Sequence, residues 1–188
     1  MQLENSLTGK KIAILVANGF EESHMTGLHK RLVETGAVVK IVSPEKGVVN
    51  SWHDGNWGHF FPANSHLPSS MSHHYDAVIV PGGKRHIERL VSNPQTARFM
   101  RGFMEDGKPV ALFEEAVKII AVDDLIEDRK VVVAESIKEA ITAKTAEVVE
   151  GDLHVDNMLV TAVGDISPLV ENFVSCIQSY EPEAWEAA

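Results

Sequence analysis

The sequence predicts an α/β fold in which a mostly parallel central sheet is covered by helices on both faces. Continuous apolar runs at 11–17, 77–80 and 110–113 have the length and composition of strands that are buried on both sides. Stretches with apolar residues at helical spacing separate these runs. Strands that alternate with helices pair in parallel, because each helix returns the chain over the sheet. A chain of 188 residues suits a single domain of three layers.

The predicted strands are short apolar segments separated by turn residues. In chain order they are 11–17, 38–42, 48–53, 56–61, 77–80, 110–113, 130–134, 148–149, 153–155 and 159–162. Asp54-Gly55 predicts a tight hairpin turn between 48–53 and 56–61, because this dipeptide supplies the positive φ angles of a primed turn. The polar stretch 62–74 is expected to be irregular.

The predicted helices carry one apolar face each. The first follows strand 11–17 and ends at Gly36. Asn93-Pro94 starts the second, because Asn caps a helix and Pro fits its first turn. A third runs over 114–122 directly from strand 110–113, and Ser167-Pro168 opens the last.

The composition excludes several classes of function. The formal net charge is −10 and no basic patch could neutralise phosphates, so nucleic-acid and anionic-membrane surfaces are not expected. No apolar run approaches the roughly 20 residues of a membrane-spanning helix. The single cysteine permits no internal disulfide, which favours a reducing, cytoplasmic location.

Three segments with polar or glycine residues follow predicted strands. They are 18–22, Pro81-Gly82-Gly83 and Phe113-Glu114-Glu115. In open α/β sheets the site forms outside the carboxyl ends of the strands. Gly82 and Gly83 can present backbone N–H groups as an oxyanion hole does, or they can simply turn the chain. Many α/β enzymes mount a nucleophile on a strained corner like the one at Glu114, where we expect an unusual backbone conformation.

These segments, in this order, resemble the ThiJ/PfpI superfamily, which includes intracellular protease-like proteins and the parkinsonism-associated deglycase. The resembling residues are 11–17, 19–22, 75–83, 107–111, 128–131 and 159–161. The run 75–83, Tyr-Asp-Ala-Val-Ile-Val-Pro-Gly-Gly, is fairly specific in this context. The resemblance implies a flavodoxin-like sandwich of the class I glutamine amidotransferase type, a single domain over 1–188 with flexible ends at 1–9 and 181–188, and a homodimer.

The departure from this family lies at the corner. Family enzymes carry Cys-His-Gly there, with the cysteine as nucleophile, whereas this chain has Glu114-Glu115-Ala116. The family's acidic residue corresponds to Glu21, and its oxyanion-hole glycines correspond to Gly82 and Gly83. The resemblance therefore implies a pseudoenzyme without cysteine-dependent activity, acting in binding, sensing or assembly and related to stress. The C-terminal domain of large-subunit catalases, which shares this fold, also lacks the cysteine.

The resemblance also implies that Glu114 points at Glu21. Two unit charges about 4 Å apart repel by roughly 4 kcal/mol at an effective dielectric constant near 20. We therefore expect the two carboxyls to share one proton near neutral pH. Such a pair could fill the pocket as a neutral plug, or it could bind a cation. Alternatively, Glu114 and Glu21 could be the acid and base of a hydrolase or a carbonyl-processing lyase.

The remaining reactive side chains predict no cofactor and no catalytic role. Cys176 lies beside the apolar stripe of the last helix, which indicates a structural thiol. Histidines crowd 53–74, namely His53, His59, His66, His73 and His74, and three more border the expected site, namely His24, His29 and His86. No pair has the His-x3-His spacing of strong metal motifs, so surface histidines are expected, although a zinc site stays open.

The predicted hairpin is rich in aromatic residues. Trp52, Trp57, Phe60 and Phe61 could form a wall against which a small-molecule ligand stacks. They could equally pack on a neighbouring element or on a partner subunit.

Overall fold

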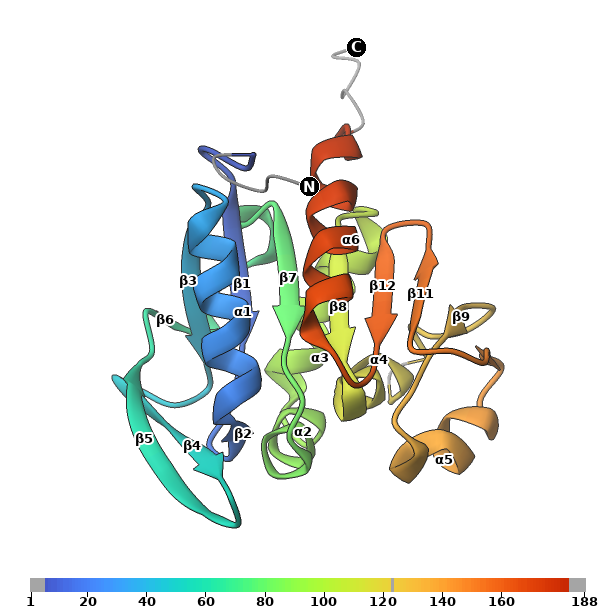
Figure 1. The fold of residues 1–188 in the computed structure, drawn as a ribbon, viewed down its shortest axis with the longest axis horizontal. Helices are drawn as coiled ribbons and strands as arrows, with labels where there is room; N and C mark the ends of the chain where they lie inside the picture. The colour runs from blue at the N-terminus through green and yellow to red at the C-terminus, as the bar shows by residue number, and fades with distance from the viewer. Residues whose placement is uncertain (1–5, 123, 183–188) are drawn as a thin grey trace.

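The structure is a computed structural model that describes residues 6–122 and 124–182. A seven-stranded sheet forms the middle layer, in the order β11-β12-β8-β7-β1-β3-β6 (Figure 1). Its strands are β1 Lys11–Leu15, β3 Val38–Ser43, β6 Ser65–His66, β7 Ala77–Val80, β8 Val110–Phe113, β11 Leu153–Asp156 and β12 Leu159–Ala162. Neighbouring strands are parallel except for the antiparallel pair β11–β12. The predicted mostly parallel α/β sheet is confirmed.

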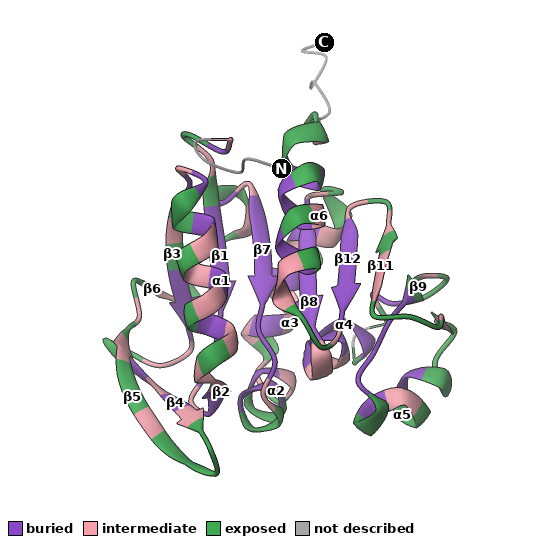
Figure 2. Ribbon diagram, in the orientation of Figure 1, coloured by how far each residue is buried: buried purple, intermediate pink, exposed green. Residues whose placement is uncertain are grey.

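Helices cover both faces of this sheet. α1 (Glu22–Glu34) and α6 (Ile166–Ser179) lie side by side over one face (Figure 1). α2 (Lys84–Val91), α3 (Pro94–Glu105) and α4 (Lys118–Ala121) contribute to the core on the other face. Side chains of β1 alternate between the two cores, with Ile12 and Ile14 on the α1 side and Ala13 and Leu15 on the α2 side. Figure 2 shows the central strands as the most deeply buried part of the molecule.

The predicted hairpin is confirmed. β4 (Val48–His53) pairs antiparallel with β5 (Asn56–Pro62), and β2 (Phe20–Glu21) adds a parallel strand to β4. Asp54 and Gly55 both have positive φ, 46° and 80°, as a primed turn requires. The pairing of β2 with β4 brings the hairpin against the loop that follows β1.

Several predicted boundaries are wrong. The corner segment 114–122 is not one α-helix, because a 3₁₀ turn over Glu114–Val117 precedes α4. Strand β9 covers only Lys130–Val131, because the N–H of the next residue, Val132, donates to the Thr161 hydroxyl. The last helix begins at Ile166, since the side chain of Asp165 caps it.

Some elements had no counterpart in the prediction. They are α2, α5 (Lys138–Thr142), the 3₁₀ turns Leu67–Ser69, Ser72–His74 and Glu135–Ile137, and the two-residue strands β2 and β6. β10 (Glu147–Val148) pairs with β9 in a separate two-stranded sheet. The expected flexible ends lie partly outside the described residues. Within the described part, Leu7 is buried and its N–H donates to the carbonyl of Thr35.

A cluster of polar contacts around Glu22 joins α1 to the hairpin. The Glu22 carboxylate accepts hydrogen bonds from the Ser51 hydroxyl and from the backbone N–H of His59, at 3.0 Å, and it contacts His59 Nδ1 at 2.8 Å. These bonds, with that of Ser51 foremost, lower the pKa of Glu22 from 4.5 to about 2. The folded state therefore favours the charged carboxylate.

This cluster predicts a pH-dependent contribution to stability. The contribution is present above pH 4.5 and is lost as the pH falls toward 2, because the folded-state pKa is the lower one. We expect Glu22→Gln to lower the free energy of unfolding at pH 7 by about 2 kcal/mol, the usual value for hydrogen bonds to a charged group. Urea denaturation across this pH range should show the difference from wild type shrinking toward the acid end.

Glu171→Gln provides the control for this prediction. Glu171 is exposed on α6, far along the chain from the hairpin. Its substitution by glutamine also removes one carboxylate. A difference between wild type and Glu22→Gln that is the same at pH 7 and at the acid end would contradict the assigned role of the carboxylate.

Candidate functional site

The carboxyl ends of three adjacent strands form the site. β8, β7 and β1 are neighbours in the sheet, so the segments that follow them meet at one edge (Figure 1). A pocket of about 590 Å³ opens there. Its lining includes Glu21, His24, Trp52, Arg85, Glu114 and Glu115. The structure thus brings together the three acidic residues that the resemblance singled out.

The corner after β8 keeps the strained conformation of a nucleophile elbow. Glu114 has φ 54°, a left-handed value that is uncommon for a residue other than glycine. The strain predicted at this residue is confirmed, and such strain is of order 1–3 kcal/mol. The Glu114 carboxylate accepts a hydrogen bond of 2.8 Å from the N–H of Gly164, in the turn that follows β12. This bond ties the corner to the neighbouring strand.

The glycine pair after β7 packs too closely for any side chain. A Cβ on Gly82 would lie 2.8 Å from His24 Nδ1 and 3.1 Å from the Cβ of Glu114. A Cβ on Gly83 would lie 2.7 Å from the backbone nitrogen of Glu21, and Gly83 has φ 126°. The Glu21 N–H also donates to the Gly82 carbonyl at 3.1 Å. Glycine at these two positions is therefore required by the close contact between three loops.

One of the expected oxyanion donors is already bonded. The N–H of Gly83 donates to the Glu115 carboxylate at 3.2 Å. The resemblance aligns Glu115 with the family's histidine. Its carboxylate accepts an N–H that was expected to serve as an oxyanion donor.

The carboxylates of Glu21 and Glu114 accept hydrogen bonds from different donors. Glu21 accepts a bond of 3.2 Å from the Ser23 hydroxyl, and Glu114 is bonded to Gly164. Both residues line the pocket, so the expectation that they form a pair stays a prediction.

His24 is a site residue that the sequence indicated only as a candidate metal ligand. It lies in the first turn of α1, and its ring packs edge-to-face on Phe113 at 4.8 Å. Its Nδ1 is buried and makes no hydrogen bond in the part of the chain that is described. Burial lowers the pKa of His24, while the nearby carboxylates of Glu21, Glu114 and Glu115 partly oppose this shift. The imidazole is therefore neutral at neutral pH.

The position of His24 just after Glu21 was a signal for this role. Glu21 is the N-cap of α1 and His24 lies in its first turn, so both residues lie at the same end of this helix.

The hairpin supplies one wall of the pocket. The Arg85 guanidinium lies 3.9 Å from the ring centroid of Trp52, which lines the pocket. Trp57 packs on Trp52 at 5.4 Å and is half exposed, whereas Phe61 packs on Phe20 at 5.6 Å. The aromatic residues thus divide between a pocket wall and internal packing, while Phe60 is exposed.

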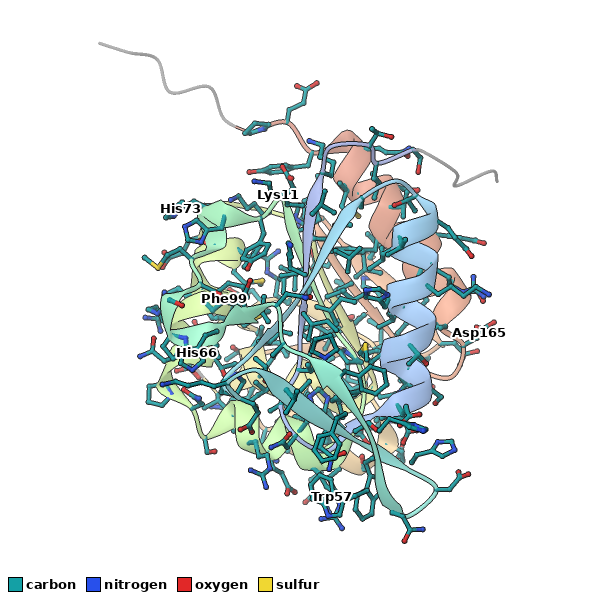
Figure 3. All side chains as sticks on the ribbon, turned by 90° about the vertical axis from the view of Figure 1, so that its left-hand side faces the viewer. Lys11, Trp57, His66, His73, Phe99 and Asp165 are labelled. Atoms are coloured by element: carbon teal, nitrogen blue, oxygen red, sulfur yellow. The ribbon has the colours of Figure 1, made fainter. Side chains whose placement is uncertain are left out.

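The histidines do not gather into a metal site. Among the described residues, no group of three or more His, Cys, Asp or Glu side chains could hold a metal ion. Figure 3 shows His66 and His73 at one side of the molecule and Trp57 of the hairpin at another end. His86 is fully buried, and its Nε2 contacts the Pro81 carbonyl at 2.9 Å. Burial lowers the pKa of His86 to about 4, which indicates a neutral structural side chain.

Cys176 is a structural thiol, as predicted. It is buried in α6, and its Sγ lies 3.9 Å from the Asn157 carbonyl oxygen. Burial raises the pKa of this thiol, which reduces its reactivity.

The described residues include no helix with the length and apolar character needed to cross a membrane.

A mostly parallel sheet covered by helices on both faces places the chain in the class of flavodoxin-like α/β sandwiches. Within that class, the chain belongs to the DJ-1/PfpI family, whose model matches residues 10–174. Deglycase PfpI from Pyrococcus furiosus is 28% identical over 170 residues, which cover 89% of this chain and 99% of the relative. General stress protein 18 from Bacillus subtilis is 26% identical, over 82% of this chain and 88% of the relative.

Two further similarities support the assignment. Catalase HPII from Pseudomonas aeruginosa is 28% identical over 120 residues, which cover 61% of this chain and 16% of the catalase. This match supports the predicted relation to large catalases. The crystal structure of a ThiJ/PfpI domain protein from Brachyspira murdochii has a TM-score of 0.81 at 19% identity and covers 93% of this chain and 99% of the other. That likeness supports the flavodoxin-like fold.

The close packing at Gly83 predicts a large effect of a single methyl group. Gly83→Ala should lower the free energy of unfolding by about 2–4 kcal/mol for two reasons. The new Cβ would clash with the backbone of Glu21, and alanine would have to adopt a positive φ. Gly151→Ala is a matched control, since Gly151 has φ 121° and nothing within 4 Å of its Cβ position. Urea denaturation should show a clearly smaller loss for the control. Equal losses would mean that φ alone requires glycine at residue 83.

Proposed function

We propose that this chain is a DJ-1/PfpI-family protein without cysteine-dependent protease, glyoxalase or deglycase activity, which uses the family pocket to bind a small molecule in sensing or assembly. The observation that carries this proposal is the pair of carboxylates at the elbow. The resemblance aligns Glu114, which has φ 54°, with the family's nucleophile, and Glu115 accepts a hydrogen bond from the N–H of Gly83. The corner therefore supplies no thiol, and one of the two expected oxyanion donors is already bonded.

The negative charges in the pocket support the proposed lack of cysteine-dependent activity. Attack on a carbonyl creates an oxyanion, which would form beside Glu114 and Glu115. A negative charge about 4 Å from another costs roughly 4 kcal/mol at an effective dielectric constant near 20. A barrier raised by that amount slows a reaction about a thousandfold. In addition, the Gly83 N–H would have to leave Glu115 before it could bind the oxyanion.

The only cysteine offers no replacement nucleophile. Cys176 is buried against the sheet face under α6, and it does not line the pocket. The raised pKa of its thiol also disfavours the reactive thiolate.

The competing function is a hydrolase or carbonyl-processing lyase that uses Glu114 and Glu21 as acid and base. Both carboxylates line the pocket, which favours this function. However, each is held by a different donor, Glu114 by Gly164 and Glu21 by Ser23. General acid–base catalysis requires that both the acid and the base lie within hydrogen-bond reach of the substrate. We therefore rank this second function below binding.

A homodimer, a cytoplasmic location and a stress-related role complete the proposal. They are carried over from the family, and the similarity to General stress protein 18 favours the stress-related role. The exposed Phe60 and half-exposed Trp57 on the hairpin are available for a contact between subunits.

We expect the purified protein to turn over neither methylglyoxal nor chromogenic amides and esters above the uncatalysed rate. Glu114→Gln should leave these rates unchanged, because it keeps the side-chain oxygen that Gly164 bonds while removing the charge. Steady-state assays of both proteins test this directly. Wild-type turnover that Glu114→Gln abolishes would overturn the proposal in favour of the acid–base enzyme.

Restoring the family residues should restore a reactive thiol. In Glu114→Cys/Glu115→His, the new cysteine sits on the strained elbow and the Gly83 N–H loses its carboxylate partner. We expect this cysteine to be oxidised by peroxide about tenfold faster than Cys176, since reactivity follows the thiolate fraction. Mass spectrometry of peptides reports the two sites separately. The single variant Glu114→Cys, which keeps the nearby Glu115 charge, is the control and should react more slowly.

A further inference from the structure

We propose that Met71 is a site of reversible oxidation by peroxides, at which the guanidinium of Arg98 binds the sulfoxide oxygen of the product. Met71 lies between two 3₁₀ turns that run over α3, and Arg98 is a residue of α3. Neither residue lines the pocket at the strand ends, so the oxidation site is separate from the proposed ligand pocket.

Met71 is the most accessible methionine among the residues that the structure describes. Its exposed fraction is 42%, whereas Met25 and Met100 are 1% and 0% exposed. Met104 and Met158 are partly buried and pack against the two cores. A peroxide reaches a thioether only where solvent reaches it, so oxidation of the folded protein should begin at Met71.

The sulfur of Met71 already has a hydrogen-bond donor beside it. Nη1 of Arg98 lies 2.8 Å from Met71 Sδ. A thioether sulfur is a weak acceptor, whereas hydrogen bonds from a charged donor to oxygen are roughly twice as strong as neutral ones. Oxidation places a polar oxygen on this sulfur. The sulfoxide oxygen should therefore replace the sulfur as the acceptor of the Arg98 N–H.

Arg98 is held in place by contacts other than the one with Met71. Its Nε donates to Gln95 Oε1 at 2.8 Å, and its Nη2 donates to the carbonyls of Leu67 and Ser70 at 3.1 and 2.9 Å. The guanidinium is thus fixed before oxidation, so binding the sulfoxide oxygen orders no further arginine rotamers. At a buried methionine, by contrast, the new oxygen would enter an apolar core without a donor.

The surrounding segment is anchored independently of the sulfur, so the oxidised protein should stay folded. The turns Leu67–Ser69 and Ser72–His74 both contact α3. Lys108 Nζ donates to the carbonyls of Ser72 and Tyr75, at 3.2 Å each. These bonds involve backbone carbonyls, which oxidation of a thioether leaves unchanged.

The oxidation balances with a peroxide as the only co-reactant. The sulfur lone pair attacks one peroxide oxygen, so that an S–O bond forms and the O–O bond breaks. The proton on the transferred oxygen passes to the departing hydroxide, which leaves as water. The sulfur loses two electrons and the peroxide gains them. In the reverse reaction two thiols return the electrons and form a disulfide, and the sulfoxide oxygen leaves as water.

Peptide mass spectrometry after limited treatment with hydrogen peroxide tests the site. Met71 should be oxidised at least about tenfold faster than Met25 and Met100, because solvent does not reach these two side chains. Dithiothreitol with the two methionine sulfoxide reductases, one for each sulfoxide epimer, should then restore the Met71 thioether. Oxidation of Met71 no faster than that of the buried pair would overturn the proposal. A Met71 sulfoxide that neither reductase repairs would also overturn it.

Two arginine variants test the part assigned to Arg98. Oxidation at Met71 alone should raise the thermal midpoint of the wild type by about 2 °C, because the new bond has a charged donor. Arg98→Gln should abolish this rise. Arg101→Gln is the matched control and should keep it, because it removes the same charge from an exposed position on the same helix. Each variant is compared with its own unoxidised form, so a lower starting stability does not affect the comparison.

Met71→Leu separates the effect of this sulfur from that of the other methionines. Leucine keeps an apolar side chain of similar size and removes the oxidisable atom, so peroxide should leave the midpoint of this variant unchanged. A midpoint that falls on oxidation of the wild type, or that rises equally in Arg98→Gln, would overturn the assignment of Arg98. The same rise in Met71→Leu would place the effect elsewhere and overturn the proposal.

Discussion

The site depends on the contact between the strained elbow after β8 and the glycine pair after β7. Glu114 and His24 lie so close to Gly82 that no Cβ fits, and the backbone of Glu21 excludes a Cβ on Gly83. This packing holds the segments that follow β1, β7 and β8 against one another. None of the three has space for a larger side chain at these contacts. The directions of the three carboxylates follow from that arrangement.

A change of two side chains on this scaffold reverses what the pocket can stabilise. A thiolate nucleophile needs free backbone donors for the negative charge that forms on its substrate. Glu114 and Glu115 instead place negative charge on the corner, and Glu115 accepts the N–H of Gly83, one of the expected donors. We infer that the backbone that would stabilise an anionic transition state in an enzyme instead holds negative charge here.

The sequence predicted the parts of the fold that depend on local pattern. β7 and β8 are continuous apolar runs, and the hairpin turn follows from Asp54-Gly55, so all three were found. α2 was missed because it starts with polar residues directly after a glycine pair and buries only His86, Ile87 and Leu90. The site residues came from the resemblance, whereas the bond from Gly164 to Glu114 joins residues 50 apart and depends on tertiary packing. No local pattern could have indicated it.

The persistence of backbone strain at Glu114 bears on whether the pocket is still used. A residue with φ 54° stores free energy that relaxation into an ordinary helix would release. In the strained conformation, the two carboxylates accept hydrogen bonds from the N–H groups of Gly164 and Gly83. The strained corner is thus the conformation that aims both charges into the pocket. A corner with no use for its side chains would gain stability by relaxing, so the strained geometry favours the proposed use of this pocket for binding.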